Sequence, residues 1–253
     1  MYNSFAEVYD LFMEDVPYDR WAIDTAGILR SNGICGGIVA ELGCGTGSLT
    51  EKLSALGYDM IGIDLSPEML DIAMNKRDAS GRDILYLCQD MREFELYGTC
   101  AAIVSRCDSM NYLQSTRDLT DTLRLVNNYL DPGGLFIFDV NSVHKYRDIL
   151  ADGVFAENRD EGSFIWENDY DVQTRINTYD LTLYIQNGSG SYGRFEEVHT
   201  QKAFTLEELK AAAREAGLMW KACLDDDTMQ EPADSTERYL IILEESGKCR
   251  QAL

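Results

Sequence analysis

The sequence has no CxxC pair and no apolar run long enough to cross a membrane. A membrane-spanning helix needs about 20 consecutive apolar residues, and no segment approaches that length. The start, MYNSFAEVYD, lacks the basic and then apolar segments of a signal peptide. The seven cysteines are odd in number and lack disulfide or zinc spacing, so we expect reduced thiols and no bound metal. These absences predict a cytoplasmic protein with no membrane partner.

Positive charge is also scarce in this chain. Lys and Arg total 22 against 44 Asp and Glu residues, so the formal net charge is -22. Such a surface repels a phosphate backbone, whose binding is normally driven by lysine and arginine. We therefore expect no nucleic-acid partner and interpret the acidic residues as a solvated surface. The 45% apolar content suffices for one core, with or without a small appended subdomain.

Strand-like and helical segments alternate through the first 140 residues. This alternation predicts an α/β fold, with a parallel sheet covered by helices on both faces. Two further strand candidates near the end of the chain complete a seven-stranded sheet. The expected strands are 38–42, 59–64, 84–88, 101–105, 135–140, 218–224 and 238–243, and the expected helices are 47–56, 66–77, 119–130 and 205–217.

A different pattern follows the fifth expected strand. Segments 163–172, 176–186 and 193–203 are rich in aromatic and β-branched residues, and the second alternates with the period of a half-buried strand. The run 187–190 is a turn signal. We therefore expect a small antiparallel β insertion in segment 143–204, between a region 1–142 and a return to the core sheet in 205–253. An exposed sheet edge leaves both a monomer and a homodimer open.

The loop after the first strand carries alternate glycines, in Gly43-Cys44-Gly45-Thr46-Gly47. A dinucleotide-binding loop requires GxGxxG, but Ser48 stands at the place of its last glycine. Glu41, just before the loop, would oppose a pyrophosphate and favour a sulfonium and an ammonium group. Asp64 ends the next strand and is placed to accept hydrogen bonds from both ribose hydroxyls. This pattern favours a cationic nucleoside without phosphate.

The segments VAELGCGTG and GIDLSPEML resemble the nucleotide-binding motifs of the class I S-adenosylmethionine-dependent methyltransferases. CQDMREF resembles the third motif of that family, and IVSRCDSMNYL with LDPGGLFIFDVN resembles its fourth strand, active-site loop and fifth strand. The resemblance is strong over residues 35–142 and weaker over 205–243. FAEVYDLFMEDVPYDRW resembles the N-terminal cap of members that act on small molecules and carry an antiparallel insert. The family fold is a Rossmann-like, doubly wound, mainly parallel seven-stranded sheet.

The resemblance implies S-adenosyl-L-methionine as the cofactor and S-adenosyl-L-homocysteine as its product. The glycine loop would line the methionine part with Glu41 beside it, and Asp64 would hold the ribose. Asp90 and the amide of Met91 would bind the adenine. The cofactor-binding residues expected on this basis are Tyr9, Glu41, Gly43, Cys44, Gly45, Gly47, Asp64, Leu65, Met69, Asp90, Met91, Cys107 and Asp108.

Several of these assignments have plainer interpretations. Leu65 and Met69 could be core residues instead of adenine contacts. Tyr9 has a spacing that equally suits helical packing. Cys107 is favoured as a small packed residue over a nucleophile, because nothing nearby in sequence would ionise it.

The expected catalytic residues are Asn111, Tyr112 and His199. The first two follow the fourth strand, where the family often contacts its substrate. His199 would share a strand face with Phe195, Glu197 and Gln201, which suits either a general base in a partly wet pocket or a solvated sheet surface.

The expected reaction is a direct, in-line methyl transfer to an oxygen, nitrogen or carbon of a small-molecule acceptor. The acceptor would bind between the N-terminal cap, residues 108–112 and the inserted sheet. A base is needed only if the acceptor carries a proton at the working pH. A non-catalytic module that binds S-adenosylmethionine is an alternative. An NAD(P)-dependent reductase is a weaker one, because the late glycine is missing and Glu41 precedes the loop.

Overall fold

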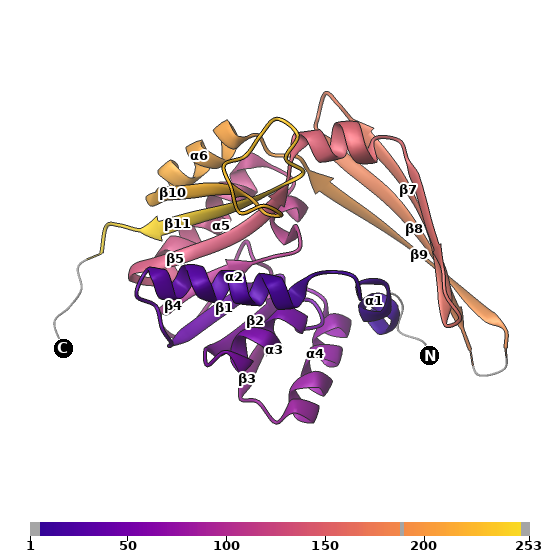
Figure 1. Ribbon diagram of the computed structural model, residues 1–253, viewed down its shortest axis with the longest axis horizontal. Helices are drawn as coiled ribbons and strands as arrows, with labels where there is room; N and C mark the ends of the chain where they lie inside the picture. Colours follow the sequence, from indigo (N-terminus) through magenta and orange to yellow (C-terminus); the bar gives the residue numbers. More distant parts are fainter. Residues whose placement is uncertain (1–5, 188–189, 249–253) are drawn as a thin grey trace.

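Two β-sheets organise the chain, as the computed structural model shows for residues 6–187 and 190–248 (Figure 1). A seven-stranded sheet with strand order β10-β11-β5-β4-β1-β2-β3 forms the body of the protein. A four-stranded sheet with order β6-β7-β8-β9 extends from one end of this body toward the N-terminal helix. No helix in these two ranges is long and apolar enough to span a membrane.

The large sheet confirms the expected Rossmann-like, mainly parallel arrangement. Its first five strands pair in parallel, whereas β11 is antiparallel to both β5 and β10. The strands are β1 (Ile38–Leu42), β2 (Asp59–Asp64), β3 (Ile84–Cys88), β4 (Cys100–Ser105), β5 (Leu130–Asn141), β10 (Leu218–Asp225) and β11 (Arg238–Glu245). The largest difference from the predicted strand boundaries is in β5, which begins at Leu130, because Leu130 pairs with Cys100 across an irregular register.

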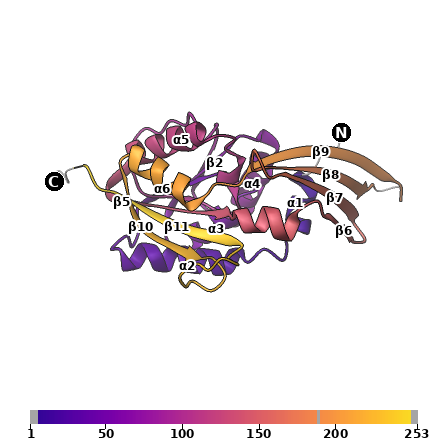
Figure 2. The same cartoon turned by 90° about the horizontal axis from the view of Figure 1, so that it is seen from above.

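Helices cover both faces of this sheet (Figure 2). On one face, α5 and α6 bury apolar side chains such as Leu123 and Leu209. On the other, α2 and α3 bury residues such as Leu29 and Leu53. The helices are α1 (Ala6–Phe12), α2 (Tyr18–Ser31), α3 (Ser48–Ala55), α4 (Pro67–Ser80), α5 (Thr116–Tyr129) and α6 (Leu206–Glu215), with a 3-10 helix at Ser109–Tyr112 and a π-helix at Lys145–Leu150.

Two of these helices begin where the sequence predicts. The Ser66 hydroxyl accepts from the Met69 amide at 3.2 Å and caps α4, whose first residue is a proline. Thr205 and Glu208 form a complete capping box at the start of α6. Both helix starts are therefore set locally, by a side chain that satisfies free backbone amides.

The insertion is an antiparallel sheet of β6 (Val154–Asn158), β7 (Gly162–Asp171), β8 (Ile176–Gln186) and β9 (Tyr192–Lys202). Strands β7, β8 and β9 confirm the three expected segments. The edge strand β6 was not predicted, because its mostly exposed residues carry no alternating apolar signal. Residues 188 and 189 of the predicted turn lie outside the described residues, as does Cys249.

Helix α1 joins the inserted sheet to the body. Val8 packs against apolar side chains of β8, and Phe12 contacts Phe164 edge to face at 5.0 Å. On its other side, the Asp10 carboxylate lies 2.6 Å from Lys76 Nζ and accepts from the Thr46 hydroxyl at 2.6 Å. Helix α1 therefore lies directly over the glycine loop.

Candidate functional site

The glycine loop adopts a backbone that only glycine accepts without strain. Gly43, Gly45 and Gly47 have φ values of 68°, 53° and 74°. The amide of Gly43 donates to the Ile63 carbonyl at 2.8 Å, so the loop curls onto the end of β2. A Cβ at Gly43 would lie 2.6 Å from the Ser109 side chain. The loop therefore leaves bare backbone facing the space above the sheet.

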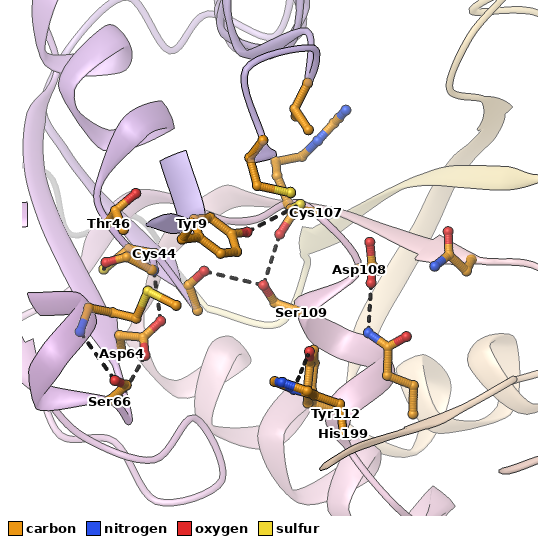
Figure 3. Close-up of a pocket in the computed structure, with 18 of the residues that line it drawn as sticks. Tyr9, Cys44, Thr46, Asp64, Ser66, Cys107, Asp108, Ser109, Tyr112 and His199 are labelled. Carbon is orange, nitrogen blue, oxygen red and sulfur yellow. Dashed lines mark hydrogen bonds between the residues drawn. The ribbon is translucent and has the colours of Figure 1, made fainter. Parts of the chain in front are cut away.

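Asp64 holds this loop from the end of β2 (Figure 3). Its carboxylate accepts from the Gly45 amide at 2.7 Å and from the Ser66 amide at 2.9 Å, one bond to each oxygen. Burial raises the pKa of Asp64, and these amide bonds oppose that effect. Each oxygen keeps a lone pair for further donors, as binding of a ribose diol requires.

Glu41 lies beneath the loop and is 3% exposed. The Thr50 hydroxyl donates to its carboxylate at 2.5 Å. Burial raises the pKa of Glu41 to about 8; the bond from Thr50 lowers it, and the nearby Asp64 raises it further. The group is therefore mostly neutral at pH 7, until a cation reaches it.

A cavity of about 1270 Å³ runs from the glycine loop to the inserted sheet. It exceeds the usual size of a site for one small ligand and has room for two. The sequence-predicted residues that line it are Tyr9, Glu41, Gly43, Cys44, Gly45, Asp64, Leu65, Met69, Asp90, Met91, Cys107, Asp108, Tyr112 and His199.

Gly47 and Asn111, which the sequence also predicts as site residues, do not line this cavity. The Asn111 side chain is fully buried: its amide nitrogen donates to the Lys202 carbonyl at 2.8 Å and its oxygen accepts from the Asn141 amide at 2.9 Å. The side chain joins the 3-10 helix to β5 and β9. Gly47 faces Tyr86, whose ring leaves no room for a Cβ.

The far end of the cavity carries a chain of polar side chains. Tyr112 Oη lies 2.8 Å from Tyr179 Oη and 3.1 Å from His199 Nδ1. His199 Nε2 lies 3.1 Å from Glu197 Oε2. Burial raises the pKa values of both tyrosines, so both phenols stay neutral. His199 shares the half-buried face of β9 with Glu197 and Gln201, as predicted.

The surroundings of four other predicted cofactor-binding residues differ in exposure and in charge. Leu65 is 64% exposed, so its alternative assignment to the core is wrong. Asp90 is held by Arg92, whose hydrogen bonds lower the pKa of its carboxyl group. Burial raises the pKa of Cys107 to about 12, which favours the neutral thiol and agrees with a packed residue. Tyr9 Oη lies 3.9 Å from the Cys107 sulfur.

Sequence reasoning missed the residues that connect α1 to the loop. Lys76 Nζ donates to the hydroxyls of Thr46 and Ser48 at 3.1 and 2.9 Å, and Asp10 bonds to all three of these residues. The four side chains come from α1, the glycine loop, α3 and α4. No local pattern relates segments so far apart.

Comparison with known proteins fits this geometry. A family model described as a methyltransferase domain matches residues 39–134. YqeM of Bacillus subtilis, assigned as a methyltransferase, is 34% identical over 97% of this chain and 98% of its own length. The chain belongs to the class I S-adenosylmethionine-dependent methyltransferases.

Structural similarity to this family extends over the whole fold. The crystal structure of an S-adenosylmethionine-dependent methyltransferase from Clostridium acetobutylicum matches with a TM-score of 0.88 and 30% identity, over 97% of this chain and 99% of that one. A dTDP-3-amino-3,4,6-trideoxy-alpha-D-glucopyranose N,N-dimethyltransferase from Streptomyces venezuelae is 27% identical over 84% of this chain and 89% of that protein. The methyltransferase therefore uses S-adenosylmethionine, and the reductase alternative is wrong.

Replacing Asp64 with alanine should weaken binding of S-adenosylhomocysteine by about 1–3 kcal/mol, because a ribose diol and two loop amides lose their acceptor. Isothermal titration would measure this. Asp59→Ala is the matched control, because Asp59 is an exposed residue at the opposite end of β2. Equal affinities of the Asp64→Ala variant and the unaltered methyltransferase would show that the ribose is held elsewhere.

Binding of S-adenosylhomocysteine should strengthen as the pH rises toward about 8, by up to about tenfold per unit. The free methyltransferase holds Glu41 protonated below its pKa of about 8. An ammonium group beside it favours the carboxylate, so binding releases a proton that is more easily lost at higher pH. Titrations between about pH 6 and 8 would measure the slope.

The Glu41→Gln variant is the control for this slope. It keeps the shape of the side chain but cannot ionise, and the amino group of the ligand titrates identically with both proteins. The variant should therefore show a flatter pH dependence than the unaltered methyltransferase. Identical slopes for the two proteins would remove Glu41 from the ammonium site.

Proposed function

We propose that this methyltransferase transfers a methyl group directly to an oxygen, nitrogen or carbon of a small-molecule acceptor. One observation carries the proposal: a single cavity joins the glycine loop to the inner face of the inserted sheet. In this arrangement, regions 1–142 and 205–253 hold the donor, and segment 143–204 closes over the acceptor. The Streptomyces venezuelae relative, named for N,N-dimethylation of a dTDP-linked amino sugar, supports a small-molecule acceptor.

The donor end of the cavity suits S-adenosylmethionine in shape and charge. Open space above Gly45 admits a close ligand, since no atom would lie within 4 Å of a Cβ there. Glu41 would face the ammonium group and Asp64 the ribose, with Asp90 and the Met91 amide at the adenine. Leu65 and Met69 would flank the adenine ring, and Tyr9, Cys44, Cys107 and Asp108 would surround the methionine part and the sulfonium.

The charge of the cavity favours a neutral or cationic acceptor. Its lining includes nine acidic and five basic residues. The two most buried basic groups are already paired: Arg106 with Asp226 at 2.7 Å, and Arg238 with Asp108 at 2.8 Å. A phosphate or carboxylate acceptor would find few free positive charges here.

Catalysis in this proposal rests mainly on alignment. S-adenosylmethionine, when bound, supplies an activated methyl group, and the transfer removes positive charge from the sulfur. The protein orients the acceptor and excludes water. A proton leaving the acceptor would pass to Tyr112 Oη while the proton of that phenol passes to His199 Nδ1. Glu197 would hold His199 through Nε2 at 3.1 Å.

Two measurements test this function. Isothermal titration with S-adenosylhomocysteine should show binding, whereas NADH should show none. Incubation with S-adenosylmethionine and a panel of small amines, phenols and alcohols should then release S-adenosylhomocysteine. Release of S-adenosylhomocysteine with a protein acceptor alone would contradict the small-molecule proposal. If no acceptor leads to its release, the alternative of a non-catalytic module that binds S-adenosylmethionine would be supported.

A further inference from the structure

Two neighbouring residues at the cavity wall have an unusual backbone. Cys107 and Asp108 have φ values of 60° and 50°, and neither is glycine. Left-handed backbone is unfavourable for residues with a Cβ, and two in succession are rarer still. Both residues line the cavity, between β4 and the 3-10 helix Ser109–Tyr112. Strain of this kind persists only where surrounding groups enforce it.

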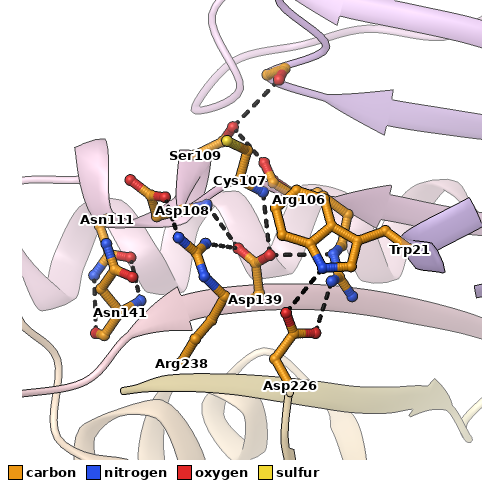
Figure 4. Close-up of polar contacts among 12 residues, drawn as sticks. Trp21, Arg106, Cys107, Asp108, Ser109, Asn111, Asp139, Asn141, Asp226 and Arg238 are labelled. Atoms are coloured by element: carbon orange, nitrogen blue, oxygen red, sulfur yellow. Dashed lines mark hydrogen bonds and ion pairs between the residues drawn. The ribbon is translucent and has the colours of Figure 1, made fainter. Parts of the chain in front are cut away.

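The enforcing group is the carboxylate of Asp139 on β5 (Figure 4). It is 0% exposed and accepts both strained amides: Cys107 donates to Oδ2 at 3.1 Å and Asp108 donates to Oδ1 at 2.6 Å. The two strands are parallel neighbours, with Ser105 beside Phe138, so Asp139 lies directly beneath the turn. One buried carboxylate therefore satisfies two consecutive backbone donors.

Two arginines pair with this carboxylate and hold it in place. Arg106 Nε lies 3.1 Å from Oδ2 of Asp139, and Arg238 Nη1 lies 3.1 Å from Oδ1. Each arginine also has a second carboxylate, Asp226 for Arg106 and Asp108 for Arg238. The network therefore connects the turn to β5, to β11 and to the loop between β10 and β11.

The same network sets the direction of the Asp108 side chain. Its Oδ1 accepts from Arg238 at 2.8 Å and its Oδ2 accepts from Gln201 at 2.6 Å. Gln201 belongs to the inserted sheet and accepts from the buried Tyr146 hydroxyl at 2.8 Å. The turn is thus held from below by Asp139 and from the side by the inserted sheet.

We propose that Asp139 is a positioning residue for methyl transfer: it holds Cys107 and Asp108 in left-handed backbone and so shapes the wall between donor and acceptor. The proposal rests on the donor site described above. A residue with a merely structural role would stabilise the fold without setting the conformation of this turn. The two roles predict different responses to a glycine at position 107.

The first variant is Asp139→Asn. The two amides bond to different oxygens of Asp139, and asparagine has only one oxygen, so its NH2 group would face one of the two backbone donors. The fold should survive, because Arg106 keeps Asp226 and Arg238 keeps Asp108. We expect binding of S-adenosylhomocysteine to weaken by roughly tenfold or more in isothermal titration, as the stranding of a buried backbone donor implies.

A second substitution separates positioning from general stability. Glycine reaches left-handed backbone without strain, so Asp139→Asn with Cys107→Gly should recover most of the lost affinity. Asp139→Asn with Cys107→Ala is the matched control, because it removes the same thiol but keeps a Cβ, and it should not recover. Equal affinities of the two double variants, or unchanged binding by Asp139→Asn alone, would overturn the proposal.

A stability measurement covers the case in which Asp139→Asn does not fold. With Asp139 intact, Cys107→Gly should melt about 2–4 °C above Cys107→Ala, since only alanine retains the strain. The reverse order would show that the turn carries no strain for Asp139 to hold. If the unaltered methyltransferase does not bind S-adenosylhomocysteine, the donor site fails, and this comparison still tests the turn.

Discussion

Replacing Gly43 with alanine is expected to weaken binding of S-adenosylhomocysteine by about 30-fold or more. Two effects add at this position. The φ of 68° costs a residue with a Cβ about 1–2 kcal/mol. The new methyl group would also lie 2.6 Å from the Ser109 side chain, and relief of such overlap typically costs about 1–3 kcal/mol. Isothermal titration with S-adenosylhomocysteine would measure the loss.

Gly45→Ala is the matched control for this prediction. Gly45 has a similar φ of 53°, but no atom would lie within 4 Å of its Cβ. The control variant should lose affinity only through backbone strain and ligand contact. Ser109 also donates to the Gly43 carbonyl at 3.2 Å, so only Gly43→Ala disturbs the contact between the loop and the 3-10 helix. Similar losses in both variants would mean that the packing against Ser109 is unimportant.

Replacing His199 with alanine is expected to lower kcat by about 100-fold or more, the usual contribution of a general base. The affinity for S-adenosylhomocysteine should stay the same, because His199 lies at the end of the cavity away from Asp64 (Figure 3). A general base should affect kcat without affecting the affinity for S-adenosylhomocysteine, whereas a residue that stabilises the fold should affect both. Initial rates with an accepted small molecule, together with titration of the product, would measure both.

His144→Ala is the control, since the chain has two histidines. His144 Nδ1 lies 2.7 Å from Asp148 on the π-helix, and His144 does not line the cavity. Its replacement should leave kcat unchanged. If His199→Ala retains full kcat, the acceptor needs no base or loses its proton elsewhere, and the relay through Tyr112 is wrong.

Local patterns predicted most of the central fold. The alternation of strands and helices, the cap at Ser66 and the capping box at Thr205 depend on neighbours within a few residues. β6 was missed because an exposed edge strand needs no apolar alternation. The start of β5 was missed because the residues after Leu130 resemble a turn, and only pairing with β4 extends the strand through them.

The donor end of the cavity was easier to predict from the sequence than the acceptor end. The donor end follows from a short stretch of chain, since the glycine loop and Asp64 are separated by one helix and one strand. At the acceptor end, Asn111 was assigned to catalysis from its place after β4. Its side chain is buried and bonds to the backbone of β5 and β9, a placement that the sequence alone does not reveal.

The sequence by itself determined the order of the functional segments along the chain. These are a glycine loop that suits a cationic nucleoside, then Asp64, and further on an inserted sheet. Glycine spacing and charge decide these features, because they act within the loop. Only the tertiary structure decided that Glu197, His199 and Tyr112 form one chain of contacts, and that Asp139 holds two strained residues between two arginines. Tyr112 is far in sequence from His199, and Asp139 is far from Arg238, and folding buries these groups together where a low dielectric makes each unpaired charge costly.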